Sequence, residues 1–363
     1  GCEISLEENA KKEDMLTEIL KLIAPGTALR EGLENILKAK TGALIIIGDS
    51  KEIMEIVDGG FKINEDYTPA RLYELAKMDG AIVLSSDMKK ILLANAQIMP
   101  SHTIPTQETG TRHRTAERTA KQTGELVISI SQRRNIITVF KGNLRYTIEE
   151  TSKIITKANQ ALQILEKYKK VFDSKLSILN EYEFNDIVTL DNVINCLQRA
   201  EKVMMVVEEV KKSIYQLGTD GRLVQMQLDE LIGGLENEEL LMIKDYLAQT
   251  KRKAPEKVLE EIRKTGANIN EIIIAKVLGY ENFENYEEIA VYPKGYRILS
   301  KVPKVPSNIV DNLVKYFKSF QHILLAEIEE LDKVEGIGEI RAKNIKQTLK
   351  RMQEQFVFDN IMI

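Results

Sequence analysis

The sequence predicts a multidomain chain of α/β and all-α parts. We expect an N-terminal α/β domain with a central mixed sheet, a middle bundle of long helices, and a C-terminal domain of short helices. Strand-length apolar runs alternate with helical patterns up to residue 146. Residues 106–254 contain no proline, and apolar residues recur there three or four positions apart. Prolines and tight glycine turns return in the last part of the chain. We place the domains at 1–146, 147–288 and 289–363.

The amino-acid composition limits the classes of protein to which the chain can belong. The chain has 363 residues, a formal net charge of -4 and 43% apolar residues, which is enough for two or three packed domains. Its cysteines, Cys2 and Cys196, form no CxxC pair, and three histidines cannot build a His-rich metal centre. We therefore expect a reducing, cytoplasmic setting. No apolar run approaches the roughly 20 residues needed to span a bilayer, so no membrane partner is expected. Gly1 is interpreted as a processing or expression remnant.

Short runs rich in Ile, Val and Leu predict the sheet of the N-terminal domain. A turn at Lys141-Gly142-Asn143, followed by Leu144–Tyr146, indicates a hairpin. Strands that alternate with helical segments are typical of a layered α/β domain. The expected strands are Ala43–Ile47, Ala81–Leu84, Ile91–Ala94, Leu126–Ile130 and Ile136–Phe140.

The sequence of the middle part, 147–288, predicts long amphipathic helices. Its apolar positions follow helical spacing, and its many charged residues are expected to form a solvated face. Helices are expected to break or end at Gly218, Gly221 and the Gly233-Gly234 pair.

The C-terminal part is punctuated by Pro293, Pro303 and Pro306, and carries an excess of basic residues. From residue 291 onward, twelve Lys and Arg outnumber nine Asp and Glu, whereas the preceding residues carry a net charge of -7. The sign of this asymmetry suits a polyanionic partner.

The segment VEGIGEIRAKNI, 334–345, places a glycine turn between two helical patterns. Glycines allow the turn to approach another surface, and the amides that open the second helix can face a phosphate. The segment resembles the helix-hairpin-helix family of DNA-binding modules, and 296–313 resembles a degenerate first hairpin. The resemblance implies sequence-tolerant DNA binding with a possible preference for branched junctions. An ordinary helical hairpin is the alternative. The expected DNA-binding residues are Gly336, Gly338, Arg341, Lys343 and Lys346.

The segment GTRHRTAER, 110–118, concentrates positive charge just before a helical pattern. We expect Thr115 to cap a helix over Ala116–Gln122, so that Arg112, His113 and Arg114 lie at its N-terminus. Helix amides and guanidinium groups together favour an anion, and so many donors suit a triphosphate. A solvated basic loop is the alternative interpretation.

A second motif, KMDGAIVLS at 77–85, places Asp79-Gly80 before a buried strand. A carboxylate at the mouth of a strand can hold Mg²⁺ or Mn²⁺, or orient a hydroxyl. Gly80 lets backbone amides approach a ligand. Taken alone, the pair would indicate an ordinary turn.

Together, DGA at 79–81 and GTRHRTAER at 110–118 resemble the diadenylate cyclase family. The order of the parts resembles bacterial DNA-integrity scanning proteins, which are cyclases with a DNA-binding end. The resemblance implies a catalytic set of Asp79, Arg112, His113 and Arg114, with Asp79 and His113 contacting Mg²⁺ or Mn²⁺. It also implies nucleotide contacts from Gly80, Ala81, Ile98, Thr111, Arg112, Thr115 and Ser131.

The resemblance further implies that two ATP molecules are condensed into cyclic di-AMP with release of two pyrophosphates. Because one domain carries one ATP, it implies facing cyclase domains in a homo-oligomer, typically an octamer, with a cytoplasmic, nucleoid-associated location. The competing hypothesis is a DNA-repair or scaffold protein that holds a nucleotide without turnover. Neither a GxxxxGK[ST] loop nor a kinase GxGxxG pattern is present, which disfavours an NTPase or kinase.

Overall fold

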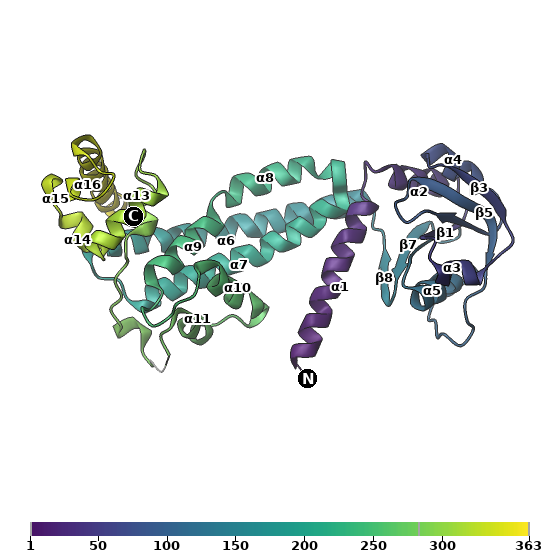
Figure 1. Ribbon diagram of the computed structural model, residues 1–363, viewed down its shortest axis with the longest axis horizontal. Helices are drawn as coiled ribbons and strands as arrows, with labels where there is room; N and C mark the ends of the chain where they lie inside the picture. Colours follow the sequence, from purple (N-terminus) through teal and green to yellow (C-terminus); the bar gives the residue numbers. More distant parts are fainter. Residues whose placement is uncertain (1, 282–283, 362–363) are drawn as a thin grey trace. The chain divides into compact units, whose positions relative to one another are not determined.

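The computed structural model describes residues 2–281 and 284–361 (Figure 1). It divides into two compact units. The first contains the described residues up to 159 together with 210–226, and the second contains 160–209 and the described residues from 227 onward. Gly1 lies outside the described residues. A search of the described helices finds none that combines the length and the apolar character needed to cross a membrane.

The first unit is built on one mixed sheet of eight strands, in the order β2-β5-β4-β1-β6-β7-β8, with β3 also paired to β5. Strands β1 and β4 are parallel, and β1 pairs antiparallel with β6. The expected strands are present, whereas β2 and β3 were not anticipated. The strands are β1 (Ala43–Ile47), β2 (Val57–Asp58), β3 (Phe61–Asp66), β4 (Ala81–Leu84), β5 (Lys90–Ile98), β6 (Leu126–Ser131), β7 (Ile136–Lys141) and β8 (Leu144–Thr147).

Both faces of this sheet are covered by helices, because the central strands are apolar on both sides. Ile45 of β1 packs with Leu33 and Leu72, from α2 and α4, on one face. Its neighbour Ile46 packs with Ile53 and Ala116, from α3 and α5, on the other face. Burying each large aliphatic side chain stabilises the fold by roughly 1.5–3 kcal/mol. The helices are α1 (Cys2–Leu22), α2 (Ala28–Lys38), α3 (Lys51–Ile56), α4 (Pro69–Leu75) and α5 (Thr111–Thr123).

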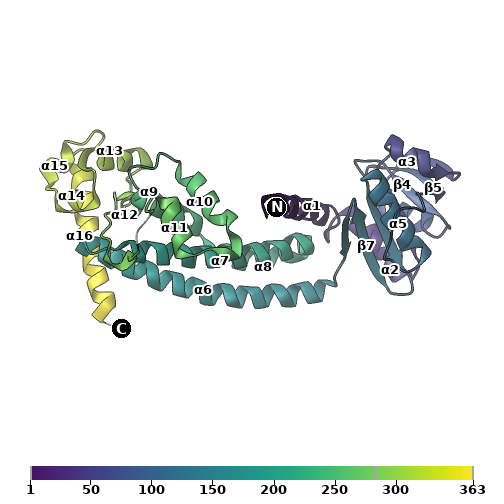
Figure 2. The same cartoon turned by 90° about the horizontal axis from the view of Figure 1, so that it is seen from below.

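The middle of the chain is helical, as expected. Within the second unit α6 and α7 run side by side (Figures 1 and 2), and their Leu179 and Val193 join Met242, Leu259 and Ile274 in one apolar core. The helices are α6 (Thr151–Asn185), α7 (Leu190–Leu217), the 3₁₀ turn η1 (Gly218–Gly221), α8 (Arg222–Ile232), α9 (Leu235–Tyr246), α10 (Pro255–Lys264), the 3₁₀ turn η2 (Gly266–Asn268) and α11 (Glu271–Leu278).

The C-terminal part consists of short helices around a second apolar core of the same unit. The sequence before the glycine turn shows a helical pattern over Ile323–Leu331. In the structure this stretch is interrupted at Ala326, whose extended backbone ends α14 before α15 begins. The elements are the 3₁₀ turn η3 (Tyr286–Glu288), α12 (Tyr296–Leu299), α13 (Ser307–Phe317), α14 (Phe320–Leu325), α15 (Ile328–Asp332) and α16 (Glu339–Ile361).

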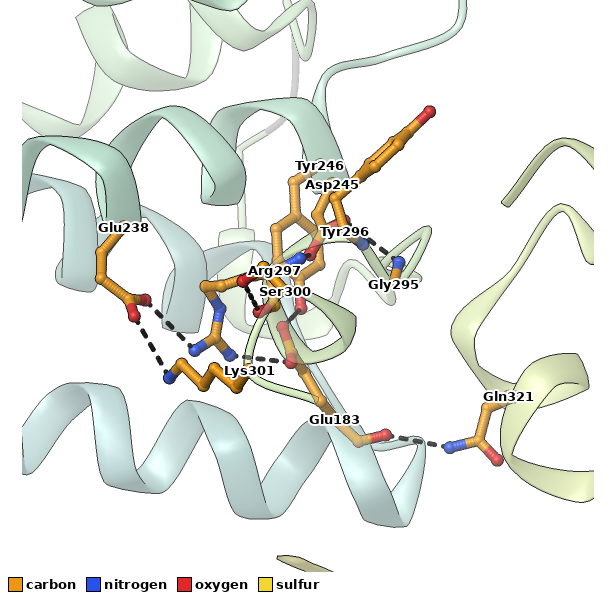
Figure 3. Close-up of polar contacts among 10 residues, drawn as sticks. All are labelled: Glu183, Glu238, Asp245, Tyr246, Gly295, Tyr296, Arg297, Ser300, Lys301 and Gln321. Carbon is orange, nitrogen blue, oxygen red and sulfur yellow. Dashed lines mark hydrogen bonds and ion pairs between the residues drawn. The ribbon is translucent and has the colours of Figure 1, made fainter. Parts of the chain in front are cut away.

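A buried ion pair connects the helical middle to the C-terminal helices (Figure 3). The guanidinium of Arg297, which is 0% exposed, donates from Nη2 to Glu183 Oε2 over 2.8 Å. The other Glu183 carboxylate oxygen accepts from the Tyr246 hydroxyl over 2.5 Å. Arg297 Nη1 also lies 3.6 Å from Glu238. Removing one partner of such a pair leaves the other charge unpaired in the interior and lowers the free energy of unfolding by about 3–5 kcal/mol.

Asp245 reinforces the same joint from the end of α9. Its Oδ1 accepts backbone hydrogen bonds from Gly295 and Tyr296 over 3.1 and 2.7 Å, and its Oδ2 accepts one from Arg297 over 3.3 Å. Burial, assisted by the charge of Glu183, raises the pKa of Asp245 to about 7. The start of α12 is therefore held against α9 by backbone contacts as well as by the ion pair.

Candidate functional site

A cavity of about 730 Å³ opens beside the start of α5 and the edges of β4, β5 and β6. This volume lies within the range of about 300–1,000 Å³ that is common for small-molecule sites. The structure brings most of the expected nucleotide residues to this one place. Those lining it are Gly80, Ala81, Ile98, Thr111, Arg112, His113, Thr115 and Ser131. Asp79 and Arg114 are exposed residues adjacent to this lining in sequence.

Helix α5 begins five residues earlier than expected. Thr115 does not cap it. The cap is Gly110, at φ +90°, and Arg114 N donates to Gly110 O over 3.1 Å to open the helix. Thr115 Oγ1 instead donates to Thr111 O within the first turn. The expectation of a Thr115 cap is wrong because glycine adopts this left-handed turn without strain.

This early start makes the helix end a candidate anion site. The first amides of an α-helix have no partner within the helix, and Gly110 has no side chain to satisfy them. The first turn contains no acidic residue, so the positive end of the helix dipole is not neutralised. The backbone amides of Thr111, Arg112 and His113 therefore have no hydrogen-bond acceptor within the helix, and these three residues line the cavity.

Arg112 lies across the sheet edge at the end of β6. Its Nη1 donates to Ile130 O over 3.4 Å, and the guanidinium passes over Gly42, which precedes β1. A Cβ added to Gly42 would lie 1.7 Å from Arg112 Nη1. Gly42 is thus a positioning residue for Arg112 that sequence reasoning missed.

His113 is the buried member of the triplet, only 3% exposed. Its Nδ1 is 2.8 Å from Ser129 Oγ, and its ring meets Phe140 edge-on. Nε2 is buried and has no hydrogen-bond partner among the described residues. Burial lowers the pKa of His113, and the positive charge of Arg134 lowers it further. The imidazole is therefore neutral at neutral pH, and its buried Nε2 is left unpartnered among the described residues.

The DGA segment is shaped by an irregularity in β5. Asn95 has φ +55°, and the β4–β5 register shifts between Ala81 and Val83. Gly80, at φ +86°, packs so closely on this irregularity that an added Cβ would lie 2.7 Å from Ala96 O. Asn95 Nδ2 also donates to Asp79 O over 2.7 Å. Glycine is required at position 80, and Asn95 holds the backbone that carries the Asp79 carboxylate.

Two further cations line the cavity. Arg133 and Arg134 lie in the turn between β6 and β7, where Arg134 N donates to Ser131 Oγ over 3.2 Å. Arg134 Nη2 reaches Thr109 O over 3.4 Å, next to the start of α5. A basic pair between two of the expected strands was the available signal, and sequence reasoning did not use it.

Arg114 serves the loop that precedes α5. Its Nε donates to Glu108 O over 3.0 Å, and Arg118 Nε donates to Ile104 O over 3.0 Å. The Glu108 carboxylate is buried and paired with Arg145. In this conformation Arg114 shapes the loop before α5, and it does not line the cavity.

A divalent ion would have to share its ligands with a nucleotide. Among the described residues, no group of three or more His, Cys, Asp or Glu side chains could hold a metal ion. Mg²⁺ is commonly held by one or two carboxylates together with substrate phosphates and water. The Asp79 carboxylate fits that pattern, and the unpartnered Nε2 of His113 would suit Mn²⁺ better than Mg²⁺.

The expected DNA-binding residues surround the second hairpin turn. Gly336 has φ +84° and lies over Ile309, Ile337 is buried in the core, and Gly338 faces open space. Arg341 Nη1 donates to Gly336 O over 2.7 Å, which closes the turn. Asn344 Nδ2 donates to Pro303 O over 2.9 Å and so ties this hairpin to the first.

The two lysines of this set differ in their surroundings. Lys343 is exposed and pairs with Glu339. The ammonium of Lys346 instead contacts the carbonyl oxygens of Leu324 and Ala326 at the end of α14. Lys343 is therefore the freer of the two to meet a phosphate.

The comparisons with known proteins match two regions of the chain. A model of the DisA bacterial checkpoint controller nucleotide-binding region matches residues 30–144, and one of the DisA linker region matches residues 148–287. Similar relatives are named DNA integrity scanning protein DisA. That of Acetivibrio thermocellus is 54% identical over 96% of this chain and 98% of its own length. That of Clostridium kluyveri is 53% identical over 96% and 99%, and that of Carboxydothermus hydrogenoformans is 53% identical over 95% and 98%.

Proposed function

The chain belongs to the DisA family of DNA integrity scanning proteins, and from that premise we propose that it is a diadenylate cyclase. It would condense two ATP molecules into cyclic di-AMP and release two pyrophosphates. The observation that carries the proposal is the uncapped start of α5, where free amides and Arg112 meet the DGA backbone in one cavity of nucleotide size.

The reaction consists of two equivalent transfers. The 3′-hydroxyl oxygen of each ATP attacks the α-phosphorus of the ATP opposite. A new O–P bond forms, and the bond between the α-phosphorus and the bridging oxygen breaks, so that pyrophosphate leaves with that electron pair. Asp79 would help to activate the hydroxyl by accepting its proton. One cavity of about 730 Å³ holds one nucleotide, so two domains would have to face each other.

The side chains around the cavity would offset the charge that develops. The α5 amides and Arg112 would hold phosphate oxygens, and Arg133 and Arg134 would add positive charge beside them. Neutral His113 would donate or accept at Nε2 according to its tautomer. Mg²⁺ or Mn²⁺, held by Asp79 and the phosphates, would neutralise charge on the triphosphate. Holding both nucleotides in line would supply much of the rate.

The C-terminal hairpins would bind DNA through backbone phosphates. The exposed Gly338 and the amides that open α16 support this role, and Arg341 and Lys343 lie within the same turn of helix. We further propose that branched DNA binds there and alters cyclase output. A homo-octamer with facing cyclase domains, in the cytoplasm and associated with the nucleoid, completes the proposal.

The test is to incubate the purified protein with ATP and Mg²⁺ or Mn²⁺ and to identify the products by mass. Cyclic di-AMP with two equivalents of pyrophosphate is expected. Unchanged ATP would favour a nucleotide-holding DNA-repair or scaffold protein, and ADP would indicate an NTPase. Asp79→Asn should bind ATP and make no cyclic product. Turnover by this variant at the wild-type rate would contradict the assigned role.

A further inference from the structure

A second cavity, of about 520 Å³, lies in the second unit, far along the sequence from the cyclase residues. It is bounded by the end of α9, the segment that leads into α12, and the turn between α13 and α14. Asp245, Tyr246 and Gln321, drawn in Figure 3, contribute to its wall. The cavity is therefore built on the rigid joint formed by Arg297 and Glu183.

Lys294 places an incompletely satisfied ammonium in this cavity. Its side chain is half-buried, and its Nζ donates to Lys244 O over 3.4 Å, which is a long contact. Among the described residues Lys294 forms no ion pair. Asp245, the nearby carboxylate, already accepts three backbone amides. Burial lowers the pKa of Lys294, and the nearby negative charge of Asp245 offsets only part of this effect.

Two further polar side chains line the cavity. Lys318 follows α13 at φ +67°, and its exposed side chain adds a second positive charge. His322 Nδ1 lies 3.0 Å from Phe317 O, so this nitrogen carries the proton. The other nitrogen, Nε2, is then left for a ligand. Asp186 is the acidic residue of the lining that remains exposed.

An aromatic surface lies beside these cations. Tyr292 lines the cavity and is 62% exposed. Tyr280 lines it too, and its hydroxyl is anchored to Tyr246 O over 2.7 Å. Positive charges suit a phosphate group, and an aromatic surface beside them suits the base or sugar of a small phosphate ester.

We propose that this cavity is a second ligand site, which binds a small phosphate ester of nucleoside monophosphate size. Lys294 and Lys318 contact the phosphate, His322 Nε2 accepts from a sugar hydroxyl, and the ring of Tyr292 covers the base or the sugar. The site is separate from the cyclase cavity, and the proposal does not depend on cyclase activity.

The chain contains no tryptophan, which allows a local reporter. A Tyr292→Trp variant of the full-length protein carries one tryptophan, at this cavity, so its fluorescence reports this site and not the cyclase cavity. It is titrated with AMP, with ribose 5-phosphate and with adenosine. A saturable change is expected with the two phosphate esters and none with adenosine. An equal response to adenosine, or no saturable response to any probe, would overturn the proposal.

Charge-removing variants in the same reporter background test the recognition residues. Lys294→Met keeps the apolar stem and should weaken AMP binding by at least about tenfold, the effect of one lost charge-assisted contact. Lys318→Asn keeps a residue that tolerates positive φ, and should weaken binding by a smaller factor. Lys315→Gln, on the exposed side of α13, is the matched control and should titrate like its parent. Unchanged AMP affinity in both cavity variants would reject the site.

A second measurement covers the case in which Tyr292→Trp itself perturbs the cavity. Calorimetric titration of the unaltered protein with ribose 5-phosphate should give a binding heat that Lys294→Met removes and Lys315→Gln retains. Identical heats in the two variants would also reject the site.

Discussion

The side-chain amide of Asn95 donates a hydrogen bond to the backbone carbonyl oxygen of Asp79 over 2.7 Å, and so links the irregularity in β5 to the DGA turn. Asn95 has φ +55°, which asparagine tolerates better than most residues. One residue therefore shapes the strand and also fixes the backbone beside the candidate catalytic carboxylate.

Asn95→Gly should reduce the rate of cyclic di-AMP formation while it preserves the fold. Glycine keeps the positive φ but removes the hydrogen bond, so the Asp79 carboxylate is held less precisely. Misplacement of this kind costs about tenfold to a hundredfold in kcat. Steady-state kinetics with ATP provide the measurement, and KM should change little. Wild-type kcat in Asn95→Gly would refute the positioning role.

Gly42→Ala should weaken ATP binding. Its new Cβ would occupy the place of Arg112 Nη1, and the flexible end of that side chain would have to move. We expect KM for ATP to rise by about tenfold, consistent with loss of one charge-assisted phosphate contact. Thermal unfolding should stay close to wild type, because the displaced group is the end of a side chain. An unchanged KM would show that Arg112 does not need this location.

Acidification should destabilise the first unit through His113. Because its pKa is lowered in the fold, the native state binds fewer protons than the unfolded chain. The contribution of His113 is complete above its ordinary pKa of 6.5 and is lost as pH falls through the lower native value. The melting temperature measured between pH 7.5 and pH 5 should fall by a few degrees. His113→Asn should remove this part of the slope, and an identical slope in both proteins would contradict the assignment.

Arg297→Met should destabilise the second unit by about 3–5 kcal/mol, because it leaves the Glu183 carboxylate buried without its ion-pair partner. Guanidinium unfolding, with hydrogen exchange followed in α9 and α12, measures the effect. Lys301→Met is the control. Lys301 pairs with Glu238 over 3.2 Å in a partly exposed setting and should contribute less than about 1 kcal/mol. Equal effects of the two variants would argue against a special role for the buried pair.

Gly338→Ala should weaken DNA binding by about tenfold at fixed salt without loss of stability. A Cβ at this position meets no protein atom within 4 Å, so it would obstruct only a bound partner. Filter-binding or anisotropy titrations with branched and linear duplexes provide the test. Gly336→Ala differs, because its Cβ would lie 2.4 Å from Ile309 Cδ1, and it should destabilise the hairpin itself. Wild-type affinity in Gly338→Ala would count against phosphate contact at this turn.

The strands that could be predicted from sequence are those buried on both faces. Ala43–Ile47 and Ala81–Leu84 are apolar throughout, and their boundaries agree with β1 and β4. By contrast β3 has the sequence FKINED and is mostly exposed, so no apolar alternation marks it. The start of α5 was misplaced because a capping threonine competes in sequence with a glycine whose left-handed conformation becomes evident only in the fold.

The motif residues of the candidate site could be proposed from sequence, but their supports could not. Gly42 precedes Arg112 by seventy positions, and nothing local indicates that a guanidinium lies over it. In the sequence Asn95 resembles an ordinary polar residue of a strand, and only the structure shows its hydrogen bond to Asp79. Arg297 looks like a surface arginine, because the carboxylate that permits its burial lies 114 positions away. Tertiary proximity decides these roles, and a single sequence does not reveal it.

Under the proposed function, the missing side-chain cap at Gly110 would make the stability of the first unit depend on the concentration of nucleotide. A phosphate bound to those amides would complete the helix end from outside, and such binding raises the free energy of unfolding in proportion to the logarithm of ligand excess. Molecules without a nucleotide would open this corner more often and be degraded sooner, so that metabolic state would set enzyme abundance as well as turnover.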